Sequence, residues 1–300
     1  ARRRGRGGRC AGRGDRVTVQ GAVLRALRRP RGTAPQGFGR TSRRDNWAVY
    51  PIIQAIVFTV CAGYLTFSGV FWGPLFGPQY VIAEPYLSPL FSPLILFPDM
   101  PTWLSPGLLI LWIPIGFRAT CYYYRKAYYR FYFGDPPGCA VGEARVHRDT
   151  NIALENALPF ILQNLHRYLL YLAFIPLFFL WIDVIQAFGA WDGGEPIHTP
   201  FNGTAHPQIG LGGLLLLVNV ILLTGYSLSC HSLRHLVGGR IDCFSCTRAR
   251  RVRYSLWQRL TDLNRNHMWW AWTSLITVTL ADVYIRLLQA GVVTDPAIYL

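Results

Sequence analysis

Five long apolar runs constrain the fold of this 300-residue chain more than any other feature of its sequence. The first run, residues 49–72, has no charged residue and is long enough to cross about 30 Å of hydrocarbon as a helix. Four more candidate spans follow at residues 106–124, 158–187, 209–236 and 267–288. Because a segment within hydrocarbon has to satisfy its own backbone hydrogen bonds, we predict an all-α integral membrane protein, a bundle of five transmembrane helices.

The basic residues set the expected orientation of that bundle. Arg and Lys are concentrated in residues 118–148 and 234–265, whereas residues 73–105 and 183–208 have acidic residues but no basic ones. The positive-inside rule therefore places the N-terminus in the cytoplasm and the C-terminus outside. The Pro-rich segment 73–105 is then expected as an outer loop between helices 1 and 2. We expect a multi-pass protein of the bacterial inner (cytoplasmic) membrane, in contact with membrane lipid.

Residues 1–44 are expected to form a disordered basic tail. They contain fourteen Arg and one Asp, and so carry +13 of the chain's formal charge of +15. The tail is Gly-rich and lacks a pattern of aromatic residues interleaved with the basic ones, so we expect no nucleic-acid partner. Residues 1–16 are low-complexity Arg/Gly sequence that could lie upstream of the natural start. The membrane-anchor domain is therefore expected over residues 45–295.

A cluster of potential metal ligands follows the fourth apolar run. His231 and His235 are four residues apart, so on a helix they share one face and can bind one metal ion. Cys243 and Cys246 form a C-x-x-C pair, a spacing at which two thiolates reach one metal from a tight turn. We predict that these four side chains form a metal site at the cytoplasmic membrane edge. Zinc accepts such ligands, and so does a two-iron cluster with two Cys on one iron and two His on the other.

Three further side chains, Cys121, Cys230 and His166, are alternative ligands because they lie on different predicted spans at similar depth. The seven cysteines are an odd number, and several lie beside apolar helices on the predicted cytoplasmic side. We therefore expect free thiols or metal ligands and no disulfide framework. A polar residue such as His166 inside a span indicates function by default. It supports an alternative in which haem b is bound by His166 and by His231 or His235.

A very aromatic and basic run, residues 117–130, is predicted where the second helix meets the cytoplasm. Arg and Tyr side chains can hydrogen-bond a quinone carbonyl, so Arg118 and Tyr122 are predicted quinone-binding residues. We add His267 and Trp270 from the start of the fifth helix, since a histidine can donate a proton to a reduced quinone. The alternative is an interfacial belt in which aromatic and basic side chains reach the headgroups.

The sequence predicts no catalytic residue. It has no P-loop, no G-x-G-x-x-G after a predicted strand, no H-E-x-x-H and no G-x-S-x-G. Asp282 and Arg286 are four residues apart near the outer end of the fifth span, and the simplest expectation is that they pair with each other.

Four runs resemble the membrane-anchor subunit of actinobacterial-type succinate dehydrogenase, respiratory complex II. They are PYLSPLFSP (85–93), FRATCYYYRKAYYR (117–130), CHSLRHLVGG (230–239) and LNRNHMWWAW (263–272), and the resemblance covers about residues 45–295. It implies a five-helix anchor that joins a flavoprotein subunit and an iron–sulfur subunit and has no succinate-oxidising site of its own. It also implies a Rieske-type [2Fe–2S] cluster in the anchor in place of haem, next to a quinone site.

Under this resemblance, electrons from succinate pass through flavin and soluble clusters to the anchor's cluster, and then to menaquinone or a related quinone such as ubiquinone. The resemblance implies His231 and His235 as the imidazole ligands. The other ligands stay open between the pair Cys243 and Cys246 and the alternatives on the neighbouring spans. Outside redox chemistry, the alternative is a five-helix membrane protein with a structural zinc at the C-x-x-C pair.

Overall fold

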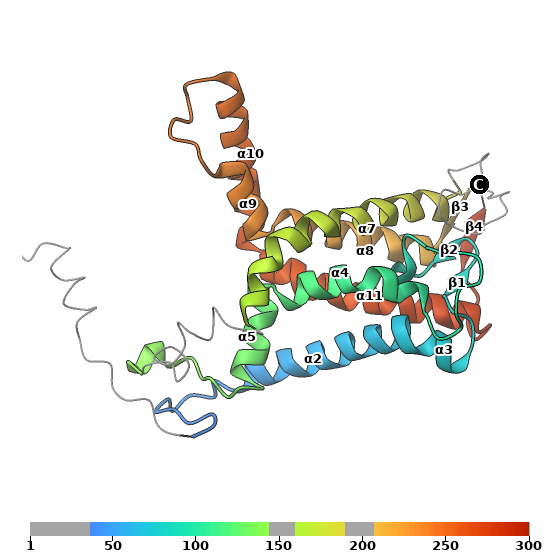
Figure 1. Ribbon diagram of the computed structural model, residues 1–300, viewed down its shortest axis with the longest axis horizontal. Coiled ribbons are helices and arrows are strands. Elements are labelled where there is room, and N and C mark those ends of the chain that lie inside the picture. Colours follow the sequence, from blue (N-terminus) through green and yellow to red (C-terminus); the bar gives the residue numbers. More distant parts are fainter. Residues whose placement is uncertain (1–36, 144–159, 190–206, 300) are drawn as a thin grey trace, which may run out of the picture.

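The computed structural model describes residues 37–143, 160–189 and 207–299. These residues form a helical bundle whose long helices run side by side along one axis (Figure 1). The bundle helices are α2 (Val49–Thr66), α4 (Pro106–Ala119), α7 (His166–Ala187), α8 (Leu211–Leu228) and α11 (His267–Gln289). Most of the predicted basic tail, residues 1–36, lies outside the described residues.

The lengths of these helices suit a membrane. In the described part of the chain, four stretches are long and apolar enough to span one: Val49–Phe76, Ile161–Ala187, Leu211–Leu228 and His267–Gln289. The apolar helix α4 has 14 residues, which at 1.5 Å each cover about 21 Å, less than the hydrocarbon thickness. Large apolar side chains such as Val60, Phe178 and Leu280 are exposed on these helices, as lipid-facing positions require. The prediction of a helical membrane protein is thus confirmed. Four helices have full spanning length, and α4 is shorter.

The second predicted span, residues 106–124, is not one helix. It breaks at Thr120 and Cys121, and α5 (Tyr122–Arg130) continues across the bundle axis (Figure 1). Cys121 has extended backbone angles, φ −71° and ψ 134°. The Thr120 hydroxyl donates to the Gly116 carbonyl at 2.8 Å, and such side-chain bonds to the preceding turn compete with the helical ladder.

The fourth predicted span, residues 209–236, breaks in the same way. After α8, Ser229 and Cys230 interrupt the helix, and α9 (His231–Gly238) leaves the bundle in a new direction. Cys230 has φ −61° and ψ 134°, nearly the angles of Cys121. The Ser229 hydroxyl donates to the Tyr226 carbonyl at 3.2 Å, again within the preceding turn.

Two short 3₁₀ helices and a longer α-helix complete the inner end, where α5 and α9 leave the bundle. A 3₁₀ helix (Phe160–Leu165) leads into α7 at His166, and another (Gly138–Val141) follows α5. The amphipathic helix α10 (Arg248–Arg265) precedes α11, which starts at the predicted residue His267. The Thr41 hydroxyl donates to Glu143 at 2.7 Å, which ties the last part of the basic tail to the segment after α5.

The opposite, outer end is closed by the Pro-rich segment. A π-helical turn (Phe67–Phe71) carries α2 into α3 (Trp72–Phe76). The antiparallel hairpin of β1 (Ile82–Ala83) and β2 (Tyr86–Leu87) and a 3₁₀ turn (Pro89–Phe91) follow, with Tyr86, Leu87, Leu90 and Phe91 buried in the core. A second antiparallel pair, β3 (Gln208–Gly210) with β4 (Ala297–Tyr299), aligns Ile209 with Ile298. The predicted outer loop is therefore a packed cover over the bundle.

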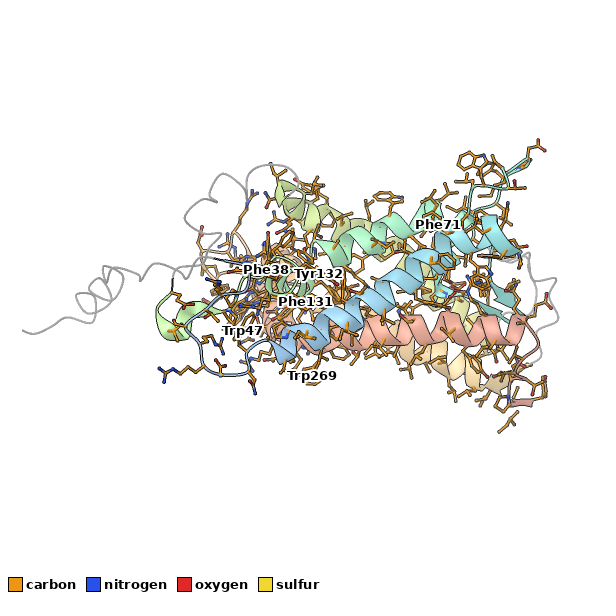
Figure 2. The ribbon with its side chains drawn as sticks, turned by 90° about the horizontal axis from the view of Figure 1, so that it is seen from below. Phe38, Trp47, Phe71, Phe131, Tyr132 and Trp269 are labelled. Carbon is orange, nitrogen blue, oxygen red and sulfur yellow. A yellow bond between two sulfur atoms is a disulfide. The ribbon has the colours of Figure 1, made fainter. Side chains whose placement is uncertain are left out.

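Aromatic side chains gather at both ends of the bundle. Figure 2 shows Trp47, Phe131, Tyr132 and Trp269 near the inner end and Phe71 near the outer end. Phe71 and Trp269 are exposed, and Phe131 and Tyr132 are partly so. Amphipathic rings at two levels are typical of a helical bundle that meets two membrane–water interfaces.

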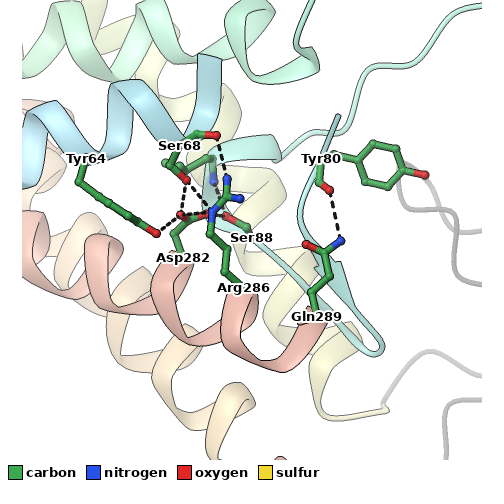
Figure 3. Close-up of polar contacts among 8 residues, drawn as sticks. Tyr64, Ser68, Tyr80, Ser88, Asp282, Arg286 and Gln289 are labelled. Atoms are coloured by element: carbon green, nitrogen blue, oxygen red, sulfur yellow. Dashed lines mark hydrogen bonds and ion pairs between the residues drawn. The ribbon is translucent and has the colours of Figure 1, made fainter. Parts of the chain in front are cut away.

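A buried polar network joins α11 to the cover at the outer end (Figure 3). The fully buried Asp282 carboxylate pairs with Arg286 at 3.0 Å, which confirms the predicted pair. It also accepts hydrogen bonds from Tyr64 at 2.8 Å, from Ser88 at 2.5 Å and from Ser68. Arg286 in turn donates to the Ser68 carbonyl at 2.8 Å. One carboxylate thus connects α2, the Pro-rich segment and α11.

Replacing Asp282 is expected to destabilise the bundle strongly. Asp282→Ala leaves Arg286 without its counter-charge in a buried site, which costs about 3–5 kcal/mol. Thermal unfolding of the purified complex in detergent measures the loss. The matched control is Asp262→Ala, which breaks the exposed pair of Asp262 with Arg265 and is expected to cost less than about 1 kcal/mol. Equal unfolding temperatures for the two variants would contradict this role of Asp282.

Candidate functional site

The ligand set predicted on α9 and the loop after it is not assembled into one site. His231 and His235 are exposed and face each other, with their Nε2 atoms 3.0 Å apart. Burial, followed by the charges of His235 and Arg234, lowers the pKa of His231. Cys243 and Cys246 are joined to each other by a disulfide, where free thiols were expected. Because a disulfide presents no thiolate, the two cysteines are not available as metal ligands in this form.

A second group of four possible ligands lies at the inner end of the bundle. The Sγ atom of Cys121 is 3.6 Å from Nε2 of His267, and the Sγ atom of Cys230 is 3.3 Å from Nε2 of His166. Cys121, Cys230 and His267 are no more than 3% exposed. Three of the four are the alternative ligands identified in the sequence. The fourth, His267, was predicted to bind quinone instead.

Each of the four residues lies where a helix begins. Cys121 and Cys230 occupy the two helix breaks, and His166 and His267 are the first residues of α7 and α11. Four segments that are distant in the sequence therefore bring two thiols and two imidazoles to one level of the bundle.

The residue before each cysteine holds one of the histidines. The Thr120 oxygen is 2.8 Å from Nδ1 of His166, and the Ser229 oxygen is 2.7 Å from Nδ1 of His267. Both hydroxyl protons are donated to carbonyls of the preceding turn, so each oxygen accepts from an Nδ1–H group. That arrangement corresponds to the Nδ1–H tautomer of both rings, with each Nε2 facing a cysteine sulfur. Metal-bound histidines are commonly oriented in this way.

An aromatic ring lies against each imidazole. Phe117 stacks on His166 with ring centroids 4.6 Å apart, and Tyr226 stacks on His267 at 5.1 Å. Both aromatic residues lie four positions before a cysteine, in FRATC (117–121) and YSLSC (226–230). Each segment thus holds one histidine with a ring and a hydroxyl and presents its cysteine to the other histidine.

This repeated pattern of an aromatic residue, two others, a hydroxyl residue and a cysteine was present in the sequence. It is the signal that could have identified Cys121 and Cys230 as the main pair. Nothing local distinguishes His267 from the neighbouring interfacial residues, because its partners come from α4 and α8.

The donor set determines which group the site could hold. Within residues 37–143, 160–189 and 207–299, no three His, Cys, Asp or Glu side chains lie close enough together to hold one metal ion. The donors lie instead as two Cys–His pairs. Two thiols and two imidazoles match in number and kind the four ligands of a two-iron cluster, whereas one tetrahedral zinc ion would need its donors around a single point.

A half-buried cation lies beside these donors. The Arg118 guanidinium donates to the Ala271 carbonyl and the Ser274 hydroxyl, both at 3.1 Å, and lies 4.9 Å from the centre of the Tyr226 ring. Among the described residues it has no carboxylate partner. The positive charge of Arg118 is therefore not neutralised by a carboxylate, and it acts on Cys121 and His267, two of the four donors.

An apolar cavity extends from Arg118 and Tyr226 toward the outer cover, between α4, α7, α8 and α11. Its walls are mostly Leu, Ile and Pro side chains, and Ser92 from the Pro-rich segment also lines it. The buried Ser92 hydroxyl lacks a hydrogen-bond partner within the described part of the chain. The buried Tyr226 hydroxyl has the Cys121 thiol as a neighbour, and sulfur is only a weak hydrogen-bonding partner. An apolar space with two buried hydroxyls, one unsatisfied and one weakly bonded, suits an apolar ligand that has hydrogen-bonding oxygens.

The other two predicted quinone residues differ in position. Tyr122 is half exposed, and Arg125 and Lys126 lie over its ring at 5.1 and 4.7 Å. It therefore belongs to the interfacial surface of α5. Trp270 packs inward against Gly225, next to Tyr226, and belongs to the core around the four donors.

Comparisons with known proteins identify the family. A sequence model described as "Actinobacterial succinate dehydrogenase subunit SdhC" matches residues 49–291. The fold is similar to a solved structure, "Mycobacterium smegmatis Sdh1 complex in the apo form", with a TM-score of 0.70 and 33% sequence identity. That similarity covers 89% of this chain and 96% of the other. No curated protein matches the chain.

The helical bundle and the family match together define a membrane-anchor subunit of a respiratory complex. The chain belongs to the actinobacterial succinate dehydrogenase subunit SdhC family. It is a subunit of a succinate:quinone oxidoreductase and associates with the other subunits of succinate dehydrogenase in the membrane. The resemblance seen in the sequence is thereby confirmed.

The close contact between α8 and Trp270 gives a test of the packing around the donors. A Cβ at Gly225 would lie 2.4 Å from the Trp270 ring, so Gly225→Ala is expected to destabilise the subunit by about 1–3 kcal/mol through overpacking. The matched control is Gly63→Ala in α2, where a Cβ meets nothing within 4 Å. Thermal unfolding of the two purified variants compares them. A Gly225→Ala protein as stable as the Gly63→Ala protein would argue against this contact.

Proposed function

We propose that this anchor subunit passes electrons to a membrane quinone through a Rieske-type [2Fe–2S] cluster bound by Cys121, Cys230, His166 and His267. The observation that carries the proposal is the convergence of two thiols and two directed Nε2 lone pairs at the inner end of the bundle. When bound, such a cluster supplies a one-electron redox centre whose potential is raised by its imidazole ligands. The surrounding side chains would orient the ligands, cover them and line the quinone site.

Thr120 and Ser229 orient the ligands. By accepting from Nδ1–H, their hydroxyls hold the two imidazoles in one tautomer and one ring orientation before any metal binds. Phe117 and Tyr226 cover the ring faces. Their rings keep water from the ligands, and a dry surrounding tunes the potential of a metal centre.

The cavity beside Arg118 is the proposed site of the quinone head group. The Tyr226 and Ser92 hydroxyls line this cavity and can donate to quinone carbonyls, and the apolar walls suit the ring and tail. The positive charge of Arg118 stabilises negative charge that arrives nearby during electron transfer. Menaquinone and ubiquinone both have the required carbonyls.

The inner end of the bundle is proposed to face the cytoplasm, with five spans crossing a bacterial inner membrane, the short α4 together with the Pro-rich segment that precedes it. Arg and Lys are concentrated at this end, as the positive-inside rule requires. The iron–sulfur subunit would then dock near the four donors and deliver electrons that the flavoprotein subunit takes from succinate.

The arrangement favours the cluster over haem b. The haem alternative pairs His166 with His231 or His235, but Nε2 of His166 faces the Cys230 sulfur at 3.3 Å. His231 and His235 face each other on the exposed surface of α9. Because the stacked Phe117 ring also covers His166, there is little space beside this histidine for a porphyrin.

Substitution of the proposed ligands tests the assignment. Cys230→Ser and His166→Ala are each expected to remove the cluster, since each takes away a donor to iron. The measurements are iron content and the low-temperature EPR spectrum of the reduced complex. His231→Ala/His235→Ala and Cys243→Ser/Cys246→Ser are the matched controls and are expected to keep both signals. The reverse pattern, with loss in the controls only, would refute the proposed ligand set.

The Tyr226 hydroxyl tests the quinone site separately. Tyr226→Phe keeps the ring on His267 but removes the proposed donor, so KM for quinone is expected to rise about tenfold, the equivalent of one hydrogen bond. Succinate oxidation with a soluble dye should not change, because it bypasses the membrane site. Tyr171→Phe on the exposed face of α7 is the control. An unchanged KM in Tyr226→Phe would remove this hydroxyl from the quinone site.

A further inference from the structure

Helices α9 and α10, with the loop between them, form an arm that leaves the bundle at its inner end. Figure 1 shows this α9–α10 arm standing across the direction of the bundle helices. Because the bundle helices cross the membrane, an element perpendicular to them at their inner end runs along the membrane surface.

One side of α10 is occupied in holding the arm together. Arg253 donates to the carbonyls of Val237 and Gly239 at 2.9 and 3.0 Å, which satisfies the end of α9. The Arg234 guanidinium lies 5.0 Å from the centre of the Trp257 ring. These contacts make the arm a defined hairpin whose α10 keeps one face against α9.

Another side of α10 is apolar and uncovered. Val252 and Leu256, four residues apart, are 54% and 47% exposed, and Phe244 in the preceding loop is 43% exposed. Residues four apart lie on one face of a helix. The α9–α10 arm therefore presents an apolar edge, Val252 and Leu256, that no described residue covers.

Arginines without partners accompany this edge. α10 contains six Arg and one Asp, and the side chains of Arg248, Arg250, Arg251 and Arg259 have no ion pair or hydrogen bond in the described part of the chain. At about 100° per residue, Arg248 and Arg259 lie within about 60° of the apolar edge. Arg250 and Arg251 point more than about 90° away from it.

We propose that the α9–α10 arm binds anionic phospholipid headgroups of the inner leaflet, with Val252 and Leu256 entering the interface and Arg248 and Arg259 contacting phosphates. Exposed apolar side chains beside arginines are typical of a helix that lies in the interface plane. The charge is complementary to an anionic leaflet, where each basic residue near the surface adds to binding.

Hydrogen–deuterium exchange of the whole complex tests the proposal. The complex is placed in nanodiscs of phosphatidylcholine, or of phosphatidylcholine mixed with phosphatidylglycerol, and amide exchange is followed over the loop and α10. We expect exchange in the anionic nanodiscs to be about 30-fold slower, the effect of two arginines at the surface. Adding inorganic phosphate to the neutral nanodiscs should not reproduce the slowing, because it lacks a surface.

Paired variants localise the effect. Arg248→Gln/Arg259→Gln is expected to abolish the difference between the two lipids, whereas Arg250→Gln/Arg251→Gln, with the same loss of charge, should keep most of it. Succinate–dye activity should be unchanged in both, since these exposed side chains make no hydrogen bond or ion pair in the described part of the chain. Equal protection in both lipids would mean that another subunit or a second copy covers the arm. That result, or equal behaviour of the two variants, would overturn the proposal.

Discussion

Two helix breaks, each stabilised by a hydroxyl group, determine the chemistry available at the inner end of this subunit. A helix break near hydrocarbon exposes backbone groups that water cannot reach, so it persists only where other groups satisfy them. Thr120 and Ser229 each bond a carbonyl of their own helix and an imidazole from another one. The breaks turn Cys121 and Cys230 out of the helical ladder, and the same bonds position the two histidines.

The two ends of the bundle differ in whether their buried or half-buried charges are neutralised by a counter-charge. At the outer end, Asp282 and Arg286 neutralise each other within a network of hydroxyls that fastens the Pro-rich cover. At the inner end, Arg118 is held by a carbonyl and a hydroxyl and keeps its charge. A neutral pair suits a structural role, whereas an unneutralised cation favours electron uptake beside it. The cavity runs between these two environments.

The proposed lipid contact is connected to the proposed redox site by the chain itself. The α9–α10 arm starts at the residue after Cys230 and ends just before His267. If the arm is fixed on the membrane surface, the backbone at both of its ends is fixed too. Those ends adjoin Cys230 and His267, two of the proposed ligands. Gly238 packs closely against Trp257, so α9 and α10 are in contact along the arm. Under these two proposals, the orientation of the inner end in the bilayer would be linked to the geometry of the donors.

Much of the architecture could be predicted because a bilayer leaves few choices to an apolar run. Length and hydropathy sufficed for the spans, and the start of α11 at His267 was predicted to the residue. The i, i+4 spacing was enough to pair Asp282 with Arg286, since helix geometry brings such residues together. The helix breaks were not predicted, because neither run has a Pro or Gly next to Cys121 or Cys230. The hydroxyl groups at the breaks bond imidazoles from other helices, and such contacts cannot be read from local sequence.

The sequence by itself determined that the chain forms a membrane bundle with a basic inner end, and it supplied every thiol and imidazole of the candidate site. Local spacing favoured His231, His235, Cys243 and Cys246, because neighbours in a sequence are the only contacts that spacing can reveal. Only the tertiary structure decided that Cys121, His166, Cys230 and His267 meet. Their contacts join four segments across the bundle, and such contacts depend on how the helices pack and where they break.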